Sequence, residues 1–364
     1  MIKNFLKYKN KRVLITGHTG FKGSWLTLWL SSLGANVIGI SNNIPTKPSN
    51  FQINKIKNKI KHFKIDIRDK KKLSKIIFRS KPDFIFHLAA QSLVKKSYKN
   101  PKYTFETNSI GTLNLLEILR LYKPKKICSV VLITSDKSYK NLELKRGYKE
   151  NDILGGYDPY SASKGCAELI IQSYLNFYLL KNKKLKISVA RAGNVIGGGD
   201  WSEDRLIPDC IRSINSKKKL LIRFPNSTRP WQHVFEALYG YLSLALLQKN
   251  KKMLNGNIFN FGPNNKSSMT VLELVRGIKS RWNSLDWKII KVKRGVYESQ
   301  LLKLNSNKAK KFLRWECILN INQSLDMIVD WYKYYYFKEK NIYNFSKNQI
   351  VKYENLLKKK LNVK

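Results

Sequence analysis

The stretch "RVLITGHTGFKG" (residues 12–23) decides the fold. Its first five residues are apolar enough to form a short buried strand, and Gly17, Gly20 and Gly23 then open a predicted helix in a GxxGxxG pattern. The first glycine permits a tight turn, the second lets backbone N–H groups approach a pyrophosphate, and the third permits close packing of helix on strand. A glycine-rich turn without a ligand is the alternative, but its place in the first strand–helix–strand unit favours a bound dinucleotide.

The same alternation of strand and helix continues to residue 197. Further strands are predicted at 36–41, 61–69, 82–91, 127–135 and 186–197, and helices at 21–34, 71–81, 103–123 and 160–180. This order predicts an α/β fold, a doubly wound parallel sheet of Rossmann type with helices on both faces.

The pattern becomes irregular after residue 197, which predicts a second part of the chain. We expect residues 1–197 to form the dinucleotide-binding Rossmann domain, completed by segments within 231–263, where "NGNIFNFGP" reads as a further strand. Residues 198–364 are expected to form mainly a smaller, mixed substrate-binding lobe and C-terminal helices.

The charge of the chain is strongly positive. Its 364 residues include 70 Lys and Arg against 24 Asp and Glu, a formal net charge of +46. The basic residues are spread along the sequence, and their densest runs, Lys70–Lys72, Lys217–Lys219 and Lys358–Lys360, are short and lack a nucleic-acid-binding motif. We interpret the excess as solvated surface that attracts small anions, not as a specific nucleic-acid site. A non-catalytic Rossmann module that binds RNA through its charge is the rival hypothesis.

Cysteine spacing and hydropathy indicate the compartment. The four cysteines, Cys128, Cys166, Cys210 and Cys317, are scattered without a CxxC pair, so neither a disulfide framework nor a metal site is expected. The N-terminal residues lack the apolar core of a signal peptide, and no window is apolar enough for a membrane span. These features predict a cytoplasmic protein with no membrane partner.

Polar residues end the predicted strand at 127–135. In "ITSDKSYKN" (residues 133–141), Ser135, Asp136 and Lys137 stand where the apolar run stops. Ligands bind at the carboxyl ends of parallel strands in such folds, so this loop is either a solvated connection or a reaction centre.

A tyrosine and a lysine share one face of the next predicted helix. In "YSASK", Tyr160 and Lys164 are spaced i, i+4. A lysine ammonium stabilises a nearby phenolate, so Tyr160 is a candidate base, although YxxxK is also common by chance. The glycine loop, the strand ending in "TSDK" and YxxxK together have the order and spacing typical of short-chain dehydrogenases.

The chain resembles the extended short-chain dehydrogenase/reductases that act on nucleotide sugars, and within them the CDP-glucose 4,6-dehydratase family. The likeness covers almost the whole length. The most specific motifs are "GGYDPYSASKGCAE" (residues 155–168) and "ARAGNVIGGGDWSEDRLIPD" (190–209), whereas GxxGFxG and YxxxK indicate only the superfamily. "LAAQSLVKKSY" (88–98), "TNSIGT" (107–112) and "RPWQHV" (229–234) are also similar to this family.

This resemblance implies an NAD-dependent 4,6-dehydration of a nucleotide sugar, used in deoxysugar biosynthesis. Tyr160 would take the proton of the sugar 4-OH while C4 gives a hydride to NAD, and Ser135 would hydrogen-bond the 4-oxygen. Water would then leave across C5 and C6, and the hydride would return to C6. Asp136 would be the acid, which requires burial to raise its pKa. Lys137, where related dTDP-glucose and GDP-mannose dehydratases have Glu, would be the base in its neutral form, which the nearby Lys164 favours.

The resemblance also implies binding residues and an assembly. The cofactor-binding residues would be Gly17, Gly20, Phe21, Gly23, Asp66, Ile67, Ala89, Ala90, Asn108, Tyr160 and Lys164. The substrate-binding residues would be Asn194, Arg205, Arg229 and His233. A homodimer or homotetramer is expected.

Three alternatives remain open at the level of sequence. The second strand ends in Ser41, Asn42 and Asn43 without the usual ribose-binding acid, although the absence of Arg there favours NAD over NADP. Asp66 could instead cap the following helix. Another nucleotide-sugar dehydratase or an epimerase could share the fold, but an epimerase needs no acid–base pair after the strand, so "SDK" argues against it.

Overall fold

A seven-stranded parallel sheet forms the centre of the protein. The computed structural model describes residues 5–263, 269–291, 302–338 and 341–362. The strands stand in the order β11-β6-β5-β4-β1-β2-β3, and every neighbouring pair is parallel. Their bounds are β1 Arg12–Thr16, β2 Asn36–Ser41, β3 Lys61–Lys64, β4 Phe84–His87, β5 Cys128–Ser135, β6 Leu185–Ala192 and β11 Ile258–Phe261.

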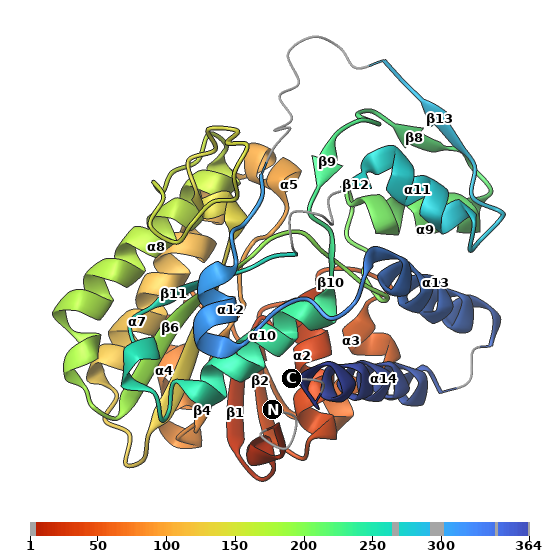
Figure 1. Ribbon diagram of the computed structural model, residues 1–364. Helices are drawn as coiled ribbons and strands as arrows, with labels where there is room; N and C mark the ends of the chain where they lie inside the picture. Colours follow the sequence, from red (N-terminus) through yellow and green to blue (C-terminus); the bar gives the residue numbers. More distant parts are fainter. Residues whose placement is uncertain (1–4, 264–268, 292–301, 339–340, 363–364) are drawn as a thin grey trace.

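Helices cover both faces of this sheet, as a doubly wound fold requires (Figure 1). Side chains alternate along each strand, so Val13 and Ile15 enter one apolar core while Leu14 enters the other. The first core contains α2 (Phe21–Ser32) and α10 (Val234–Leu247). The second core contains α4 (Lys70–Ser80), α7 (Gly111–Leu121) and α8 (Pro159–Phe177). The predicted α/β fold is confirmed.

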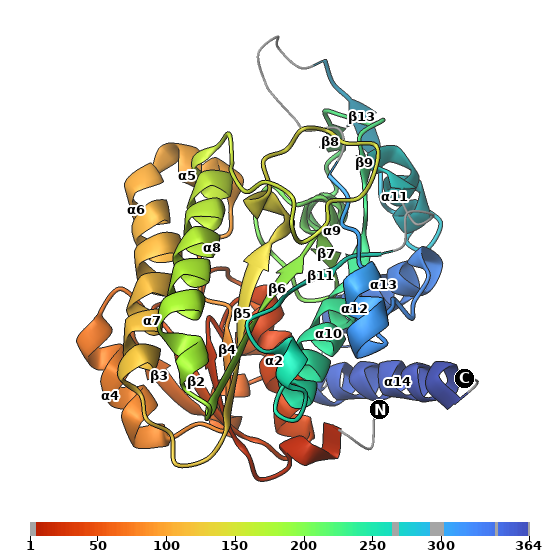
Figure 2. The ribbon, with the colours of Figure 1, turned by 60° about the vertical axis from the view of Figure 1, so that its left-hand side comes forward.

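The helix predicted at residues 103–123 is interrupted by a π-helical turn. It consists of α6 (Pro101–Phe105), η3 (Glu106–Ile110) and α7, and it follows the short α5 (Val94–Lys99). Figure 2 shows α6 and α7 beside α8 along the edge of the molecule. π-turns inside helices are frequent at functional sites because the inserted residue changes which side chains face inward.

A smaller mixed lobe stands apart from the sheet (Figure 1). Its helices are α9 (Leu206–Ser216) and α11 (Val271–Lys279). Its short strands pair as β8 (Leu220–Ile222) with β13 (Trp287–Ile289) and β9 (Thr228–Arg229) with β12 (Met269–Thr270). A further pair, β7 (Val195–Ile196) with β10 (Gln232–His233), leads from β6 to α10.

The C-terminal helices pack on the first core. These are α12 (Asn307–Leu313), α13 (Ile321–Phe337) and α14 (Ile342–Asn362). Trp29 of α2 donates a hydrogen bond to Glu354 of α14, 2.8 Å away. Trp201 is buried with its ring edge-on to Trp331 of α13. Because β11 is a strand of the sheet and α10 packs on one face of it, we propose that the Rossmann domain ends near residue 197 and resumes within 231–263.

The remaining elements are short. They are α3 (Asn50–Ile53), η1 (Leu6–Tyr8), η2 (Ile56–Lys59), η4 (Asp136–Ser138), η5 (Leu179–Lys181) and η6 (Lys252–Leu254). Asp69, not Asp66, caps α4 by accepting the N–H of Lys72, so the capping alternative for Asp66 was wrong. In the described part of the chain, no helix combines the length and apolar content that crossing a membrane requires.

Candidate active site

Glycine contacts close the turn between β1 and α2. Gly17 has φ +77°, and a Cβ built on it would lie 2.7 Å from the backbone nitrogen of Ala89. A Cβ on Gly23 would lie 2.1 Å from the carbonyl oxygen of Gly17. Within the described residues, no side chain caps α2 at Gly20, so its first N–H groups are available to an anion. The half-buried Phe21 begins the helix, and the turn fits a pyrophosphate.

Asn108 ties the loop after β4 to helix α8. Its Oδ1 accepts the N–H of Gln91 at 2.8 Å, and its Nδ2 donates to Oγ of Ser163 at 2.9 Å. Asn108 lies in the π-turn η3, while Ala90 is half-buried in the loop that Asn108 holds. The sequence did not identify Gln91 or Ser163, although both stand inside the motifs that carry the family resemblance.

Charged side chains surround a hollow at the far end of the glycine turn. Arg68 bonds Asp66 and Glu106, each at 2.9 Å, and Asn42 donates to Asp66 at 3.3 Å. Burial raises the pKa of Asp66, but hydrogen bonds from Arg68 outweigh this and leave it below its usual value. Ile67 is buried against Gly111, so its side chain is committed to the interior. The hollow is lined by Asp66, Arg68, Asp69, Glu106 and Ile110.

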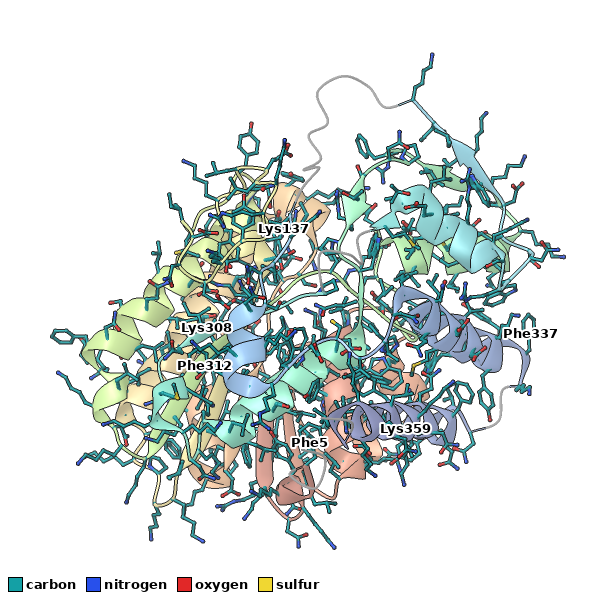
Figure 3. The ribbon with its side chains drawn as sticks, viewed as in Figure 1. Phe5, Lys137, Lys308, Phe312, Phe337 and Lys359 are labelled. Carbon is teal, nitrogen blue, oxygen red and sulfur yellow. The ribbon has the colours of Figure 1, made fainter. Side chains whose placement is uncertain are left out.

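The five predicted catalytic residues come from three adjoining elements. Ser135 ends β5, and Asp136 and Lys137 form the first residues of η4 (Figure 3 labels Lys137). The Ser135 hydroxyl donates to Oδ1 of Asp136 at 2.9 Å and accepts the N–H of Lys137 at 3.2 Å. Tyr160 and Lys164 stand in the first turns of α8, which contacts η4. Ser135, Asp136, Tyr160 and Lys164 are all buried.

Asp158 and Pro159 set the start of α8 and therefore the position of Tyr160. The Asp158 carboxylate accepts the N–H of Ser161 at 3.0 Å and caps the helix. Pro159 occupies the first helical position, where its missing N–H costs nothing. Tyr160 is thus the second residue of a helix whose beginning is specified by its neighbours in the sequence.

Burial controls the protonation of this centre. It raises the pKa of Asp136, and the charge of Lys137 opposes that rise without reversing it. It raises the pKa of Tyr160 to about 12, opposed by a hydrogen bond with Ser135 and by the charge of Arg205. It lowers the pKa of Lys164 to about 8. Burial thus shifts both Asp136 and Tyr160 toward their protonated forms.

Two further cations approach this centre. Arg205 begins α9 and forms an ion pair with the buried Asp200, at 2.9 Å. Burial lowers the pKa of Lys22 to about 8, with the charge of Arg205 lowering it further and that of Asp136 raising it. The sequence predicted Arg205 but missed Lys22 and Asp200. The signals were present, because Lys22 is a charge inside a glycine turn and Asp200 stands in a specific motif.

The other predicted substrate-binding residues, Asn194, Arg229 and His233, lie on different elements and differ in exposure. Asn194 is half-buried between β6 and β7, and its carbonyl accepts the N–H of Gln232. Arg229 lies in β9 of the lobe. His233 is only 1% exposed and caps α10, and its Nε2 has no hydrogen-bond partner among the described residues. Contact of His233 with a sugar would require repacking, so its binding role stays a prediction.

The parallel sheet, the glycine turn and the Tyr160–Lys164 pair beside a polar strand end define an extended short-chain dehydrogenase/reductase. The chain belongs to the nucleotide-sugar dehydratase family described as GDP-mannose 4,6 dehydratase, which it matches over residues 14–328. It is 43% identical over 338 residues to a CDP-glucose 4,6-dehydratase of Salmonella typhimurium, with 91% of this chain and 92% of that protein covered.

More distant relatives include epimerases. A CDP-paratose 2-epimerase of Salmonella typhi is 25% identical, with 88% of this chain and 98% of that protein covered. The solved epimerase of Methanothermobacter thermautotrophicus superposes with a TM-score of 0.77 at 25% identity, covering 93% and 97% of the two chains. The dTDP-glucose 4,6-dehydratase of Bacillus anthracis, solved with NAD, has a TM-score of 0.75 at 24% identity, covering 92% and 99%. This last likeness concerns the fold.

Proposed function

We propose that this protein is an NAD-dependent hydro-lyase that converts CDP-glucose to CDP-4-dehydro-6-deoxyglucose. The observation that carries the proposal is the identity of 43% to a CDP-glucose 4,6-dehydratase over nearly the full length of both chains. The buried Asp136 beside Lys137 supports dehydration over epimerisation, because only elimination needs an acid and a base in addition to Tyr160.

NAD fits the residues of the glycine turn. The backbone of Gly17 lies close to that of both Gly23 and Ala89, which leaves no room there for side chains. Among the described residues, no side chain caps the start of α2. Both features suit a dinucleotide pyrophosphate. Arg68 and Asn42 surround the position expected for the adenosine. When bound, NAD supplies a hydride acceptor for C4 and returns the same hydride to C6, so the overall reaction is redox-neutral.

Tyr160 removes the proton of the sugar 4-OH in the first half of the reaction, and Ser135 hydrogen-bonds the same oxygen. Because burial raises the pKa of Tyr160 to about 12, the phenol must acquire its base character when positive charge is added beside it. Lys164 and the bound nicotinamide both bring such charge. Arg205 already opposes the rise, so a substrate diphosphate that neutralised Arg205 would raise the pKa of Tyr160, and the positive charge of Lys164 and the nicotinamide would have to offset this.

Elimination uses the strand end. Oxidation at C4 makes the C5 proton acidic, and Lys137 takes that proton. Asp136 donates a proton to the 6-OH, which leaves as water. Burial raises the pKa of Asp136, which is the direction that the donor role requires. The electron pair from the C5–H bond forms the C5–C6 double bond as the C6–O bond breaks, and hydride at C6 with a proton at C5 completes the product.

Incubation with four nucleotide sugars tests the proposal. Purified protein with NAD should convert CDP-glucose, and not dTDP-, UDP- or GDP-glucose at comparable rates, to a 4-keto product detected by its absorbance in base. Reduced cofactor should not accumulate. Steady accumulation of NADH would identify a simple dehydrogenase, and a C4 epimer without water loss would identify an epimerase.

A further inference from the structure

Glu168 and Arg191 form a fully buried ion pair beside the active site. Both side chains are 0% exposed, and the guanidinium donates two hydrogen bonds to the carboxylate, from Nε at 2.8 Å and from Nη2 at 3.0 Å. Arg191 also donates from Nη1 to the carbonyl of Glu150 at 3.1 Å, and its guanidinium lies 4.5 Å from the ring centre of Tyr139. Because burying two charges is costly, this pairing holds both groups in one geometry.

The pair stands between the sheet and α8, at the point where the apolar interior of this layer gives way to polar side chains at the strand ends. Arg191 lies opposite Thr134 in the register of β6 and β5, and Leu132 and Val189 fill the equivalent positions one step deeper. A buried ion pair is weak evidence for stability, since apolar side chains often replace one without loss. We therefore expect the buried charges at the strand ends to have a role other than filling the core.

The carboxylate of Glu168 contacts both ends of the segment that carries the elimination residues. Thr134, just before Ser135, donates from Oγ1 to Oε1 of Glu168 at 2.5 Å. Ser138, just after Lys137, lies with Oγ 3.5 Å from the same oxygen and also bonds the carbonyl of Ser135. One carboxylate on α8 thus holds the residues on either side of Ser135, Asp136 and Lys137.

We propose that Glu168, held by Arg191, is a positioning residue that fixes Asp136 and Lys137 in register with Tyr160 and Lys164. This inference rests on the proposed function. Oxidation at C4 and elimination across C5 and C6 act on neighbouring atoms of one sugar, but Tyr160 and Lys164 stand on α8 whereas Asp136 and Lys137 stand on η4. Catalytic groups must be held within about 0.5 Å of their productive geometry, and the hydroxyls of Thr134 and Ser138 provide that link.

The charge of Glu168 has a second effect. Glu168 follows Lys164 by one helical turn, and its charge raises the pKa of Lys164 against the lowering that burial causes. Different variants separate the positioning effect of Glu168 from the effect of its charge on Lys164. Removing the hydroxyls of Thr134 or Ser138 releases the elimination segment and leaves the charge near Lys164 in place, whereas Glu168→Gln changes both.

The test compares the two half-reactions. Because Glu168→Gln leaves Arg191 unpaired and can prevent folding, the main variants are Thr134→Val, Ser138→Ala and their combination. NAD-loaded protein is mixed rapidly with CDP-glucose, and the appearance and decay of enzyme-bound NADH are followed. We expect the double variant to lose bound NADH at least about tenfold more slowly, and to form it with a clearly smaller loss of rate, because Tyr160 and Lys164 stay on α8 and only Ser135 of the oxidation residues lies in the released segment.

Controls separate positioning from a loss of stability. Ser129→Ala removes another buried hydroxyl from β5, which bonds the carbonyl of Ala245, away from the site. It should lower the unfolding temperature comparably and change neither rate. Thr134→Ser, which keeps the hydroxyl, should restore NADH decay to the wild-type rate.

Two outcomes would overturn the inference. If the double variant slows both half-reactions equally, or neither, Glu168 and Arg191 are only a structural pair. If the wild-type protein forms neither bound NADH nor a 4-keto product from CDP-glucose, the proposed function fails instead, and the inference falls with it. Failure of the inference shows in the rates of the variants relative to the wild type, whereas failure of the proposed function shows in the wild type alone. The two failures are therefore distinguishable.

Discussion

A Cβ built on Gly23 would lie 2.1 Å from the carbonyl oxygen of Gly17, which is closer than any side chain allows. The first turn of α2 therefore rests directly on the glycine turn, and the helix N-terminus is held against the end of β1. This contact places the first N–H groups of α2 where a pyrophosphate would bind.

Gly23→Ala should weaken NAD binding. The new methyl group meets backbone, not a flexible side chain, so α2 must shift; we expect at least about a tenfold loss of NAD affinity and a destabilisation of about 1–3 kcal/mol. Calorimetric titration with NAD and urea unfolding measure the two effects. Gly277→Ala, whose Cβ would meet only the side-chain end of Leu325 in another helix, is the matched control. Unchanged NAD affinity in Gly23→Ala would remove the glycine turn from the cofactor site.

The sequence predicted features that depend on residues close together in the chain. The glycine contacts span six residues and Tyr160–Lys164 spans four, so spacing alone identifies them. It did not predict that Lys22, Asp136 and Arg205 converge, because their meeting depends on how α2, η4 and α9 are placed in space.

The structure buries two of the predicted site residues in a way that the sequence pattern does not show, and their roles stay predictions. The phenol of Tyr160 was predicted to be a base near neutral pH, but burial raises its pKa to about 12. His233 was expected to face the substrate, yet it is 1% exposed because α10, which it caps, packs against the sheet. Neither burial is encoded in the local pattern of residues.

Tyr160→Phe should abolish oxidation itself. Without the phenol, nothing in the proposed site accepts the proton of the 4-OH, so no enzyme-bound NADH should appear when CDP-glucose is added. Loss of a positioned acid–base group typically costs about 100- to 10,000-fold in rate. Rapid-mixing absorbance measures this step. A variant within about threefold of wild type would show that another group is the base.

Glu236 should make stability fall as pH rises. Its carboxyl is 1% exposed, and burial raises its pKa to about 7 from the ordinary value of 4.5, against hydrogen bonds from the N–H groups of Ile318 and Leu319 and the hydroxyl of Tyr353. Between those values the native state keeps a proton that the unfolded state has lost. The contribution is fully present below about pH 4.5 and is lost by about pH 7, a change of about 3 kcal/mol in the free energy of unfolding.

Glu236→Gln isolates this effect because glutamine does not titrate. The difference in free energy of unfolding between wild type and variant, measured by urea at a series of pH values, should shift against the wild type as pH rises through this window. Buried His87 and His233, whose pKa values burial lowers to about 3, act in both proteins and cancel. A difference that is constant with pH would show that Glu236 titrates normally.

The net charge of +46 should not produce specific nucleic-acid binding. Any binding would be contact with phosphates, which weakens steeply as salt rises because the release of counterions into a saltier solution is less favourable. We expect binding of RNA or DNA to be independent of sequence and to collapse with added salt, while dehydration of CDP-glucose persists. Tight, sequence-selective binding at physiological salt, measured by fluorescence anisotropy, would contradict the interpretation of the charge as solvated surface.

Asp136→Asn and Lys137→Ala should oxidise C4 and then stall. Both residues serve elimination in the proposed mechanism, so rapid mixing with CDP-glucose should produce bound NADH that persists, because C6 never becomes a hydride acceptor. The stalled complex should show the absorbance of reduced cofactor without formation of the 4-keto-6-deoxy product. Rapid return of the absorbance to baseline with normal product formation would exclude both residues from elimination.

Solvent deuterium separates the roles of Asp136 and Lys137. If Lys137 removes the C5 proton, Lys137→Ala should stop exchange at C5, whereas Asp136→Asn should leave exchange running without loss of water. Ser135, which donates to Asp136 at 2.9 Å and accepts the N–H of Lys137, keeps the strand end in place in both variants. Mass spectrometry of the recovered sugar measures the exchange. If Lys137→Ala exchanges C5 at the wild-type rate, Lys137 is not the base but a charge that tunes Asp136, since it opposes the rise in the pKa of that carboxyl.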